Sequence, residues 1–140
     1  MALVLDTGPV LAAFDRSDRD HDACATLLRE ATEPLVLPAP VIVELDYLLE
    51  RQLGPTAFLD LLRDVCADTI RVEALVERDY PRVLELCAAY ADAPVGFVDA
   101  AVLAVVERLG ESKLATLDRR HFTLMRPRHT DALELLPDLG

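Results

Sequence analysis

The pattern of apolar and polar residues predicts short strands that alternate with helices. The predicted strands are apolar throughout, which is typical of strands whose sheet is covered on both faces. They comprise residues 2–6, 35–37, 69–75, 113–118 and a last strand near 131–136. The predicted helices comprise a turn at 9–14 and segments at about 20–32, 40–53, 55–67, 79–91 and 97–110. This alternation indicates an α/β fold with a parallel sheet between two layers of helices.

Residues 40–53 show the helical pattern clearly, with Pro40 at the predicted start. One face of this helix is apolar and carries Val41, Ile42, Leu45, Leu48 and Leu49. Glu44 lies at the edge of that face, whereas Glu50 and Arg51 point towards solvent. Taken alone, Glu44 is most simply an ordinary boundary residue.

The helix predicted at 97–110, which Gly110 ends, has an acid on its apolar side. Glu107 and Arg108 lie together on one side of the helical wheel, and Asp99 lies opposite them. An ionised carboxylate on a buried face is costly without a partner. The alternative is that Asp99 is an acid of the first turn, where the helix dipole favours it. The helical pattern leaves both interpretations open. Asp79 is predicted to cap the preceding helix.

Two further acids follow predicted strands. Asp6 ends the first strand, and Asp118 ends the strand KLATL. In open α/β sheets, ligands bind beyond the carboxyl ends of the strands, so these two acids are expected to face one crevice. The simpler explanation for each is that Asp is common in turns.

The four acids taken together predict a metal site. At about 5 Å, two ionised carboxylates repel each other by roughly 3 kcal/mol at an effective dielectric constant near 20. Such a group therefore needs protons or a divalent cation to neutralise it. Oxygen ligands suit Mg²⁺ or Mn²⁺ and phosphate chemistry. The histidines, His21, His121 and His129, are scattered and form no zinc motif.

Composition limits the possible functions. The chain has 140 residues, which favours a single domain spanning 1–140, and a net charge of −11. An acidic protein repels nucleic acid and anionic membranes at long range. A nuclease stays compatible because bound cations offset metal-binding carboxylates, and a basic protein partner would also suit this charge. No apolar run approaches the length of a membrane span.

The cysteines and the N-terminus indicate the compartment. Cys24, Cys66 and Cys87 form no C-x-x-C motif and lie in apolar helical patterns, so they are predicted to be buried thiols in a reducing environment. The N-terminal MALVLDTG lacks the basic segment of a signal peptide. We therefore expect a cytoplasmic protein.

The triplet Asp6-Thr7-Gly8 suggests a different chemistry, because aspartic proteases place a catalytic carboxylate in this way. Those enzymes pair two such residues across an all-β fold, whereas this chain has one D-T-G and is largely helical by pattern. A metal-dependent phosphatase is not supported either, since the first strand lacks a D-x-D motif.

Four blocks of the sequence resemble the PIN-domain ribonucleases, and within them the VapC-type toxins of bacterial toxin–antitoxin pairs. These blocks are LDTGPVLA, VELDYLL, GFVDAAVLAVVERLG and LATLDRRHF, in the order of the family and over nearly the whole chain. The resemblance implies a three-layer α/β/α sandwich with a mainly parallel sheet and an endoribonuclease that depends on Mg²⁺ or Mn²⁺. The alternative is a PIN-like module that binds RNA or protein without catalysis.

The resemblance also implies roles for individual residues. The metal-site and catalytic acids would be Asp6, Glu44, Asp99 and Asp118. Supporting positions would be Thr7 and Thr116 beside the strand-end acids, and Asp92 before the third block. RNA phosphate would contact Arg119, Arg120 and His121, unless these residues belong to a solvated loop. The implied partners are RNA, a cognate antitoxin and a second copy of the chain in a homodimer.

Overall fold

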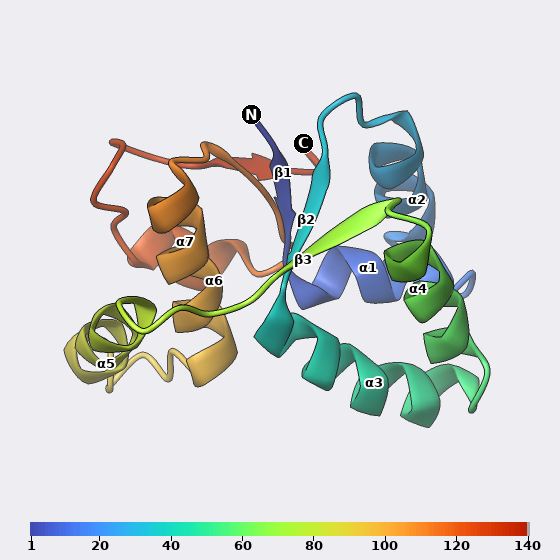
Figure 1. The fold of residues 1–140 in the computed structure, drawn as a ribbon, viewed down its shortest axis with the longest axis horizontal. Coiled ribbons are helices and arrows are strands. Elements are labelled where there is room, and N and C mark those ends of the chain that lie inside the picture. Colours follow the sequence, from blue (N-terminus) through green and yellow to red (C-terminus); the bar gives the residue numbers. More distant parts are fainter. Residues whose placement is uncertain (140) are drawn as a thin grey trace.

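In the computed structural model, which describes residues 1–139, a parallel sheet forms the centre of the molecule (Figure 1). Within these residues the sheet has five strands in the order β3-β2-β1-β4-β5, and all neighbouring strands are parallel. The strands are β1 (Leu3–Leu5), β2 (Leu35–Pro38), β3 (Ile70–Glu73), β4 (Lys113–Ala115) and β5 (Glu134–Leu136). The parallel α/β architecture predicted from the sequence is confirmed.

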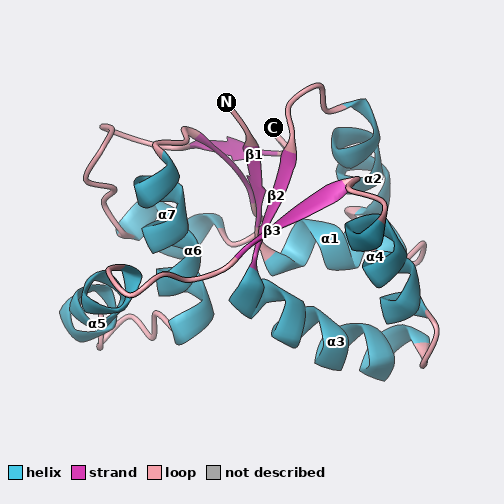
Figure 2. Ribbon diagram, viewed as in Figure 1, coloured by secondary structure: helices cyan, strands magenta, loops and turns pink. Residues whose placement is uncertain are grey.

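Helices cover both faces of this sheet, so the fold is a three-layer sandwich (Figures 1 and 2). Four helices lie on one side: α1 (Thr7–Phe14), α2 (His21–Glu30), α3 (Ala39–Leu53) and α4 (Ala57–Cys66). The other side carries α5 (Asp79–Ala89), α6 (Phe97–Leu109) and α7 (Arg119–Leu124). None of the helices in the described part of the chain is long and apolar enough to cross a lipid bilayer.

Helix α6 is the best-buried helix of the fold. Its residues from Ala100 to Val106 are all buried, and the alanines among them allow a close approach to the sheet. Gly110 follows with φ of 67°, a left-handed conformation that glycine adopts at little cost, and so ends the helix as predicted. Asp99 is thereby carried at the start of a helix that cannot shift without disturbing the core.

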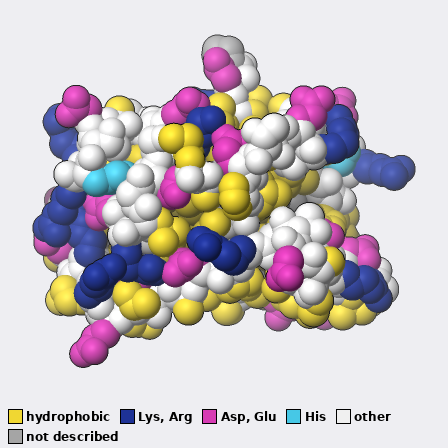
Figure 3. Space-filling model, turned by 45° about the horizontal axis from the view of Figure 1, so that its top comes forward, with side chains coloured by type: hydrophobic (Ala, Val, Ile, Leu, Met, Phe, Trp, Pro, Cys, Tyr) yellow, Lys and Arg dark blue, Asp and Glu magenta, His cyan; other side chains and the backbone are white. Residues whose placement is uncertain are grey.

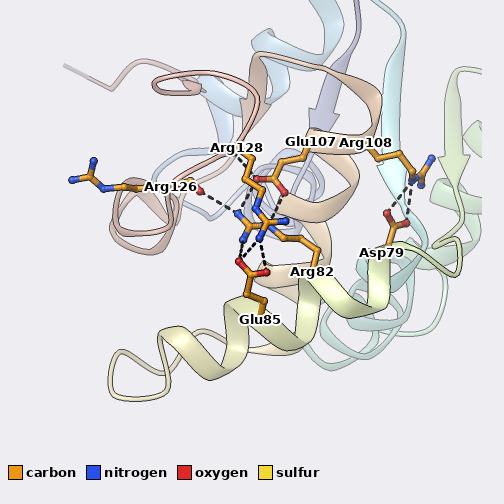
Figure 4. Close-up of polar contacts among 7 residues, drawn as sticks. All are labelled: Asp79, Arg82, Glu85, Glu107, Arg108, Arg126 and Arg128. Atoms are coloured by element: carbon orange, nitrogen blue, oxygen red, sulfur yellow. Dashed lines mark hydrogen bonds and ion pairs between the residues drawn. The ribbon is translucent and has the colours of Figure 1, made fainter.

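The polar side of α6 is held to α5 by buried ion pairs (Figure 4). Nε of Arg82 donates to Oε1 of Glu107 at 2.8 Å, and Nη2 of Arg82 donates to Oε2 of Glu107 at 2.9 Å. Both side chains are nearly buried, with 12% and 10% of their surfaces exposed. Glu85 extends this network on α5 by accepting from Arg82 and Arg128. The network therefore joins α5, α6 and the segment after α7.

A second pair corrects the prediction for Asp79. Its buried carboxylate receives Nε of Arg108 at 3.0 Å and the backbone N–H of Val76 at 2.9 Å. Arg78 occupies the N-cap position, and no side-chain cap is present there. Asp79 thus anchors α5 to α6 instead of capping α5.

Three other expectations differ from the structure. The segment RRHF lies in helix α7, not in a loop, because Asp118 caps this helix and Phe122 is buried beneath it. Cys24 is buried, but Cys87 is only partly covered and Cys66 is exposed, because Cys66 is the last residue of α4, a helix whose only buried residue is Leu61. The predicted strand 113–118 ends at Ala115, so Thr116 and Asp118 lie just beyond it.

Candidate active site

The order of the strands reverses at β1, which lies between β2 and β4. Leu5, the last residue of β1, is in register with Ala115, the last residue of β4. The residues that follow, Asp6 and Thr116, therefore emerge side by side at the carboxyl edge of the sheet. This is the place where open parallel sheets bind ligands.

Asp6 is buried, with 5% of its surface exposed, and is held by hydrogen bonds. The hydroxyl of Thr116 donates to Oδ2 of Asp6 at 2.8 Å, and the backbone N–H of Asp118 donates to that hydroxyl at 3.0 Å. Burial raises the pKa of Asp6 to about 6 against the hydrogen bonds from Thr116 and Thr7, and the charges of Asp99 and Glu44 add to the increase. A nearby cation would therefore stabilise the ionised form of Asp6.

Gly8 allows the start of α1 to lie against the end of β4. A Cβ atom at this position would be 3.2 Å from Cβ of Leu117, closer than side chains normally approach. A larger residue would therefore require the side chain of Leu117, which lies between Thr116 and Asp118, to move by a few tenths of an ångström. The glycine of the D-T-G triplet therefore allows close packing of Gly8 against Leu117.

Asp99 and Asp118 meet at the side chain of His121. Nδ1 of His121 lies 2.9 Å from Oδ2 of Asp99 and 2.7 Å from Oδ2 of Asp118. The other oxygen of Asp118 accepts the backbone N–H of His121 at 3.1 Å, which caps α7. Burial is the main cause that raises the pKa of Asp99, followed by the charge of Asp118 and opposed by His121.

Glu44 comes to the same site from α3. It is partly buried, and its charge raises the pKa values of both Asp6 and Asp99. The structure therefore brings the four predicted acids into one group of interacting carboxylates. They come from the end of β1, from α3, from the first turn of α6 and from the cap of α7.

The donor atoms of this site fit a hard divalent cation. Carboxylate oxygens dominate, and one atom each from Asp99, Asp118 and His121 lies within 4.8 Å of the others. The hydroxyl of Thr7, next to Asp6, is buried and has no hydrogen-bond partner among residues 1–139. A buried hydroxyl without a partner is uncommon and indicates a missing ligand or water.

Comparison with known proteins identifies the family. The PIN domain model matches residues 3–126. The chain belongs to the PIN-domain family. Ribonuclease VapC26 of Mycobacterium tuberculosis is 30% identical over 125 residues, which cover 89% of this chain and 93% of that protein. This relationship places the PIN domain among the VapC-type ribonucleases, as the four sequence blocks predicted.

Solved structures share the fold of this PIN domain. VapC20 of M. tuberculosis, a toxin that cleaves the sarcin–ricin loop, matches with a TM-score of 0.81 and 19% identity over 93% of this chain and 99% of that one. The DNA-bound VapBC complex of Salmonella typhimurium matches with a TM-score of 0.69 and 17% identity over 96% of this chain and 98% of that one. An all-β aspartic protease is thereby excluded.

The remaining predicted residues of this PIN domain take separate places. Asp92 is exposed in the turn between α5 and α6 and, within the described residues, forms no hydrogen bond or ion pair with the four acids. Arg119 donates to the carbonyl oxygens of Leu135 and Pro137, at the end of β5. Arg120 is exposed, whereas His121 lies inside the acidic group. The sequence pattern had not indicated His121 as part of this group.

A basic groove of about 940 Å³ adjoins α7. Its lining consists of Tyr90, Ala93, Arg119, Arg120, Thr123, Leu124 and Arg126. Basic side chains gather on the left part of the face in Figure 3, the side of the molecule that carries α5 and α7 in Figure 1. The molecule therefore has a local positive surface beside the acids, although its net charge is negative.

An apolar groove of about 630 Å³ includes Glu44 in its lining. It is bounded by α3, α5 and the start of α6, and lined by Ala39, Pro40, Val43, Glu44, Tyr47, Leu75, Tyr80, Phe97 and Val98. Val43 is 73% exposed and Tyr47 is 61% exposed, which is unusual for side chains of this size in one patch. The groove indicates a surface for a partner.

Proposed function

We propose that this PIN domain is the toxin of a toxin–antitoxin pair and hydrolyses RNA phosphodiester bonds with Mg²⁺ or Mn²⁺. The observation that carries the proposal is the group formed by Asp6, Glu44, Asp99 and Asp118 at the carboxyl edge of the sheet. Burial raises the pKa values of Asp6 and Asp99, and the charges of Glu44 and Asp118 add to the increase, so the site favours a cation over a neutral ligand. The kinship with a VapC ribonuclease supports RNA as the substrate.

The four acids divide the work of the proposed site. Asp6, Asp99 and Asp118 would hold the ion, and Glu44 would either be a further ligand or orient the attacking water. When bound, the divalent ion supplies Lewis-acid chemistry, which lowers the pKa of water and offsets charge on the phosphoryl oxygens. Thr116 fixes the orientation of Asp6, and the hydroxyl of Thr7 is free to hold a water beside it.

The basic groove beside α7 is the proposed path of the RNA strand. Arg120 and Arg126 are exposed there and offer their charges to phosphates, while Tyr90 offers a ring to a base. The guanidinium of Arg119 already donates to carbonyl oxygens at the end of β5, so Arg119 contributes less to phosphate binding than Arg120 and Arg126. This groove counters the repulsion that the net charge of −11 would impose on RNA.

The apolar groove is the proposed docking surface of a cognate antitoxin. Its walls offer exposed apolar side chains, and Glu44 at its edge leads into the acidic group. A segment with apolar residues and a basic side chain complements both features and would block the acids. Homodimerisation remains a prediction from the resemblance, and a cytoplasmic location remains a prediction from the cysteines and the N-terminal sequence.

The proposal is tested by sequencing RNA ends after brief induction of the protein, with the Asp6→Asn variant as control. New 5′ ends at defined sites that are absent from the control support an endoribonuclease. Identical RNA ends in both strains, together with RNA binding by the purified protein, would instead favour a non-catalytic PIN module.

The antitoxin is tested by co-expression with small proteins encoded beside this gene. Relief of growth inhibition and co-purification support the pairing. Loss of co-purification in a Tyr47→Ser variant, but not in Leu84→Ser on the exposed side of α5, would place the partner in the groove. If no neighbour binds, the toxin assignment fails and the nuclease assignment stands.

A further inference from the structure

The position of His121 departs from an acidic site made of carboxylates alone. Its Nδ1 atom inserts between Oδ2 of Asp99 and Oδ2 of Asp118, at 2.9 and 2.7 Å. These three donor atoms form the cluster in the described chain that is suited to holding a metal ion. The imidazole thus lies among the proposed ligands, not among the groups that face RNA.

We propose, resting on the proposed function, that His121 is a nitrogen ligand of the divalent ion and gives this site a preference for Mn²⁺ over Mg²⁺. The separations between donors fit this role. Adjacent ligands of an octahedral ion with bonds of about 2.1 Å are about 3 Å apart. The observed spacings of 2.7 and 2.9 Å are within a few tenths of an ångström of that value.

Backbone hydrogen bonds of His121 and the burial of its neighbour Phe122 hold the imidazole in place. The N–H of His121 donates to Oδ1 of Asp118, and its carbonyl accepts from the N–H of Met125 at 2.8 Å. Phe122, the next residue, is buried and fixes α7 to the core. Since Oδ1 of Asp118 is engaged by the backbone, Oδ2 is the oxygen left for the ion. Ligation uses the lone pair of Nδ1, so the proton on this atom moves to Nε2 or to solvent.

The chemistry of the ions determines the expected selectivity. Mg²⁺ takes oxygen ligands almost exclusively and gives up its waters reluctantly. Transition-metal ions accept imidazole more readily, and Mn²⁺ combines this tolerance with an affinity for carboxylates. Replacing one oxygen ligand by Nδ1 of His121 therefore favours Mn²⁺ relative to Mg²⁺.

Two other histidines provide a comparison within the chain. Nε2 of His129 lies 2.6 Å from the carbonyl oxygen of Glu111, and Nδ1 of His21 lies 2.8 Å from that of Ala12. Both rings are thus tied to backbone carbonyls away from the acids. His129→Asn is the matched control because it removes an exposed imidazole and leaves the acidic group intact.

The test measures metal binding to the purified, chelator-treated full-length protein and does not depend on cleavage. Pulsed electron paramagnetic resonance of bound Mn²⁺ is expected to show coupling to ¹⁴N in the parent and in His129→Asn, but not in His121→Asn. Calorimetry is expected to show that His121→Asn reduces the affinity for Mn²⁺ at least about tenfold. Loss of a residue that merely supports a metal ligand already costs about this much. The Mg²⁺ affinity should change by a smaller factor.

The outcomes separate the inference from the function on which it rests. Bound Mn²⁺ without ¹⁴N coupling in the parent overturns the role of His121 and leaves the carboxylate site standing. Coupling that persists in His121→Asn assigns the nitrogen to another residue and also overturns it. A parent protein that binds neither ion overturns the metal site itself.

Discussion

The hydroxyl of Thr116 donates to Oδ2 of Asp6 at 2.8 Å and accepts the backbone N–H of Asp118 at 3.0 Å. The fully buried side chain of Thr116 thus positions Asp6 and Asp118, which are 112 residues apart in the sequence. The bond also opposes the effect of burial on the pKa of Asp6. Thr116 therefore links the geometry of the site to its acidity.

Replacing Thr116 by valine keeps the shape of the side chain but removes this donor. The pKa of Asp6 is expected to rise above about 6, because the hydrogen bond that lowers it is lost. Metal affinity near neutral pH should fall about tenfold, as for other groups that orient a metal ligand. Carbon-13 NMR of the carboxyl group and calorimetry check both effects. Thr116→Ser, which keeps a hydroxyl, should restore them; no difference between the two variants would contradict this role.

Stability without metal should depend on the protonation of Asp6. Its pKa is about 6 in the folded protein and near 3.8 as a reference for the unfolded chain, so the folded state binds more protons between these values. The free energy of unfolding should then decrease as pH rises from about 4 to about 6, by up to about 3 kcal/mol. Urea titrations in the presence of a chelator measure this dependence.

Asp6→Asn supplies the test of that dependence. The neutral amide avoids the cost of a buried charge, so this variant should be more stable than the parent at pH 7 without metal and should lose most of the pH dependence. Divalent metal should stabilise the parent but not the variant. A variant that is less stable than the metal-free parent at pH 7 would refute the account of Asp6.

Asp99→Asn should abolish RNA cleavage and preserve the fold. Asp99 adds charge to the proposed metal site, and loss of such transition-state stabilisation is expected to cost at least about 100-fold in rate. Cleavage assays and circular dichroism measure the two properties. Asp46→Asn removes an exposed acid from α3 and should cleave at the parent rate. Cleavage by Asp99→Asn at that rate would remove Asp99 from the site.

The ion pair between Arg82 and Glu107 should contribute to stability through its burial. Glu107→Gln leaves the guanidinium of Arg82 partly uncompensated and is expected to lower the free energy of unfolding by about 3 kcal/mol. The control Asp60→Asn disrupts the exposed pair with Arg63 and should cost less than about 1 kcal/mol. Chemical denaturation compares them, and equal effects would show that burial of the first pair is unimportant.

The basic groove should determine how RNA binding responds to salt. Arg120→Gln and Arg126→Gln should each weaken binding and reduce the slope of log affinity against log salt by about 0.7, the value for one phosphate contact on a single strand. Titrations of catalytically inactive Asp6→Asn protein with labelled RNA at several salt concentrations give this slope. Arg29→Gln on α2 is the exposed control, and a slope that stays unchanged in the groove variants would place RNA elsewhere.

Local sequence was sufficient to predict strand β1, which Asp6 follows, and helix α6, which carries Asp99. An apolar run followed by Asp6 predicts a buried strand with an acid at its end, and a helix with three- and four-residue spacing places Asp99 opposite Glu107. These patterns reflect backbone geometry and burial, which depend on neighbours in the chain. Gly110 likewise ends α6 by its own conformational freedom.

Helix α7 shows where local pattern was insufficient. With six residues and two arginines at its start, it has no clear amphipathic pattern. Its stability comes from the cap by Asp118 and from burial of Phe122 in the core. The same cause hid the position of His121, because a ring placed between two carboxylates is visible only once α6 and α7 meet.

The sequence by itself predicted the alternation of strands and helices along the chain apart from α7, the apolar core, and the positions of Asp6 and Asp99 on their elements, because each depends on short-range periodicity and on residue chemistry. Only the tertiary structure decided that Glu107 and Arg108 are nearly buried in ion pairs, that His121 joins the acids, and that arginines of an acidic chain form a basic groove. These features depend on side chains far apart in sequence, whose separations are set by how the layers pack. Packing of the layers also buries Asp6 and Asp99, which is the main reason that their pKa values are raised.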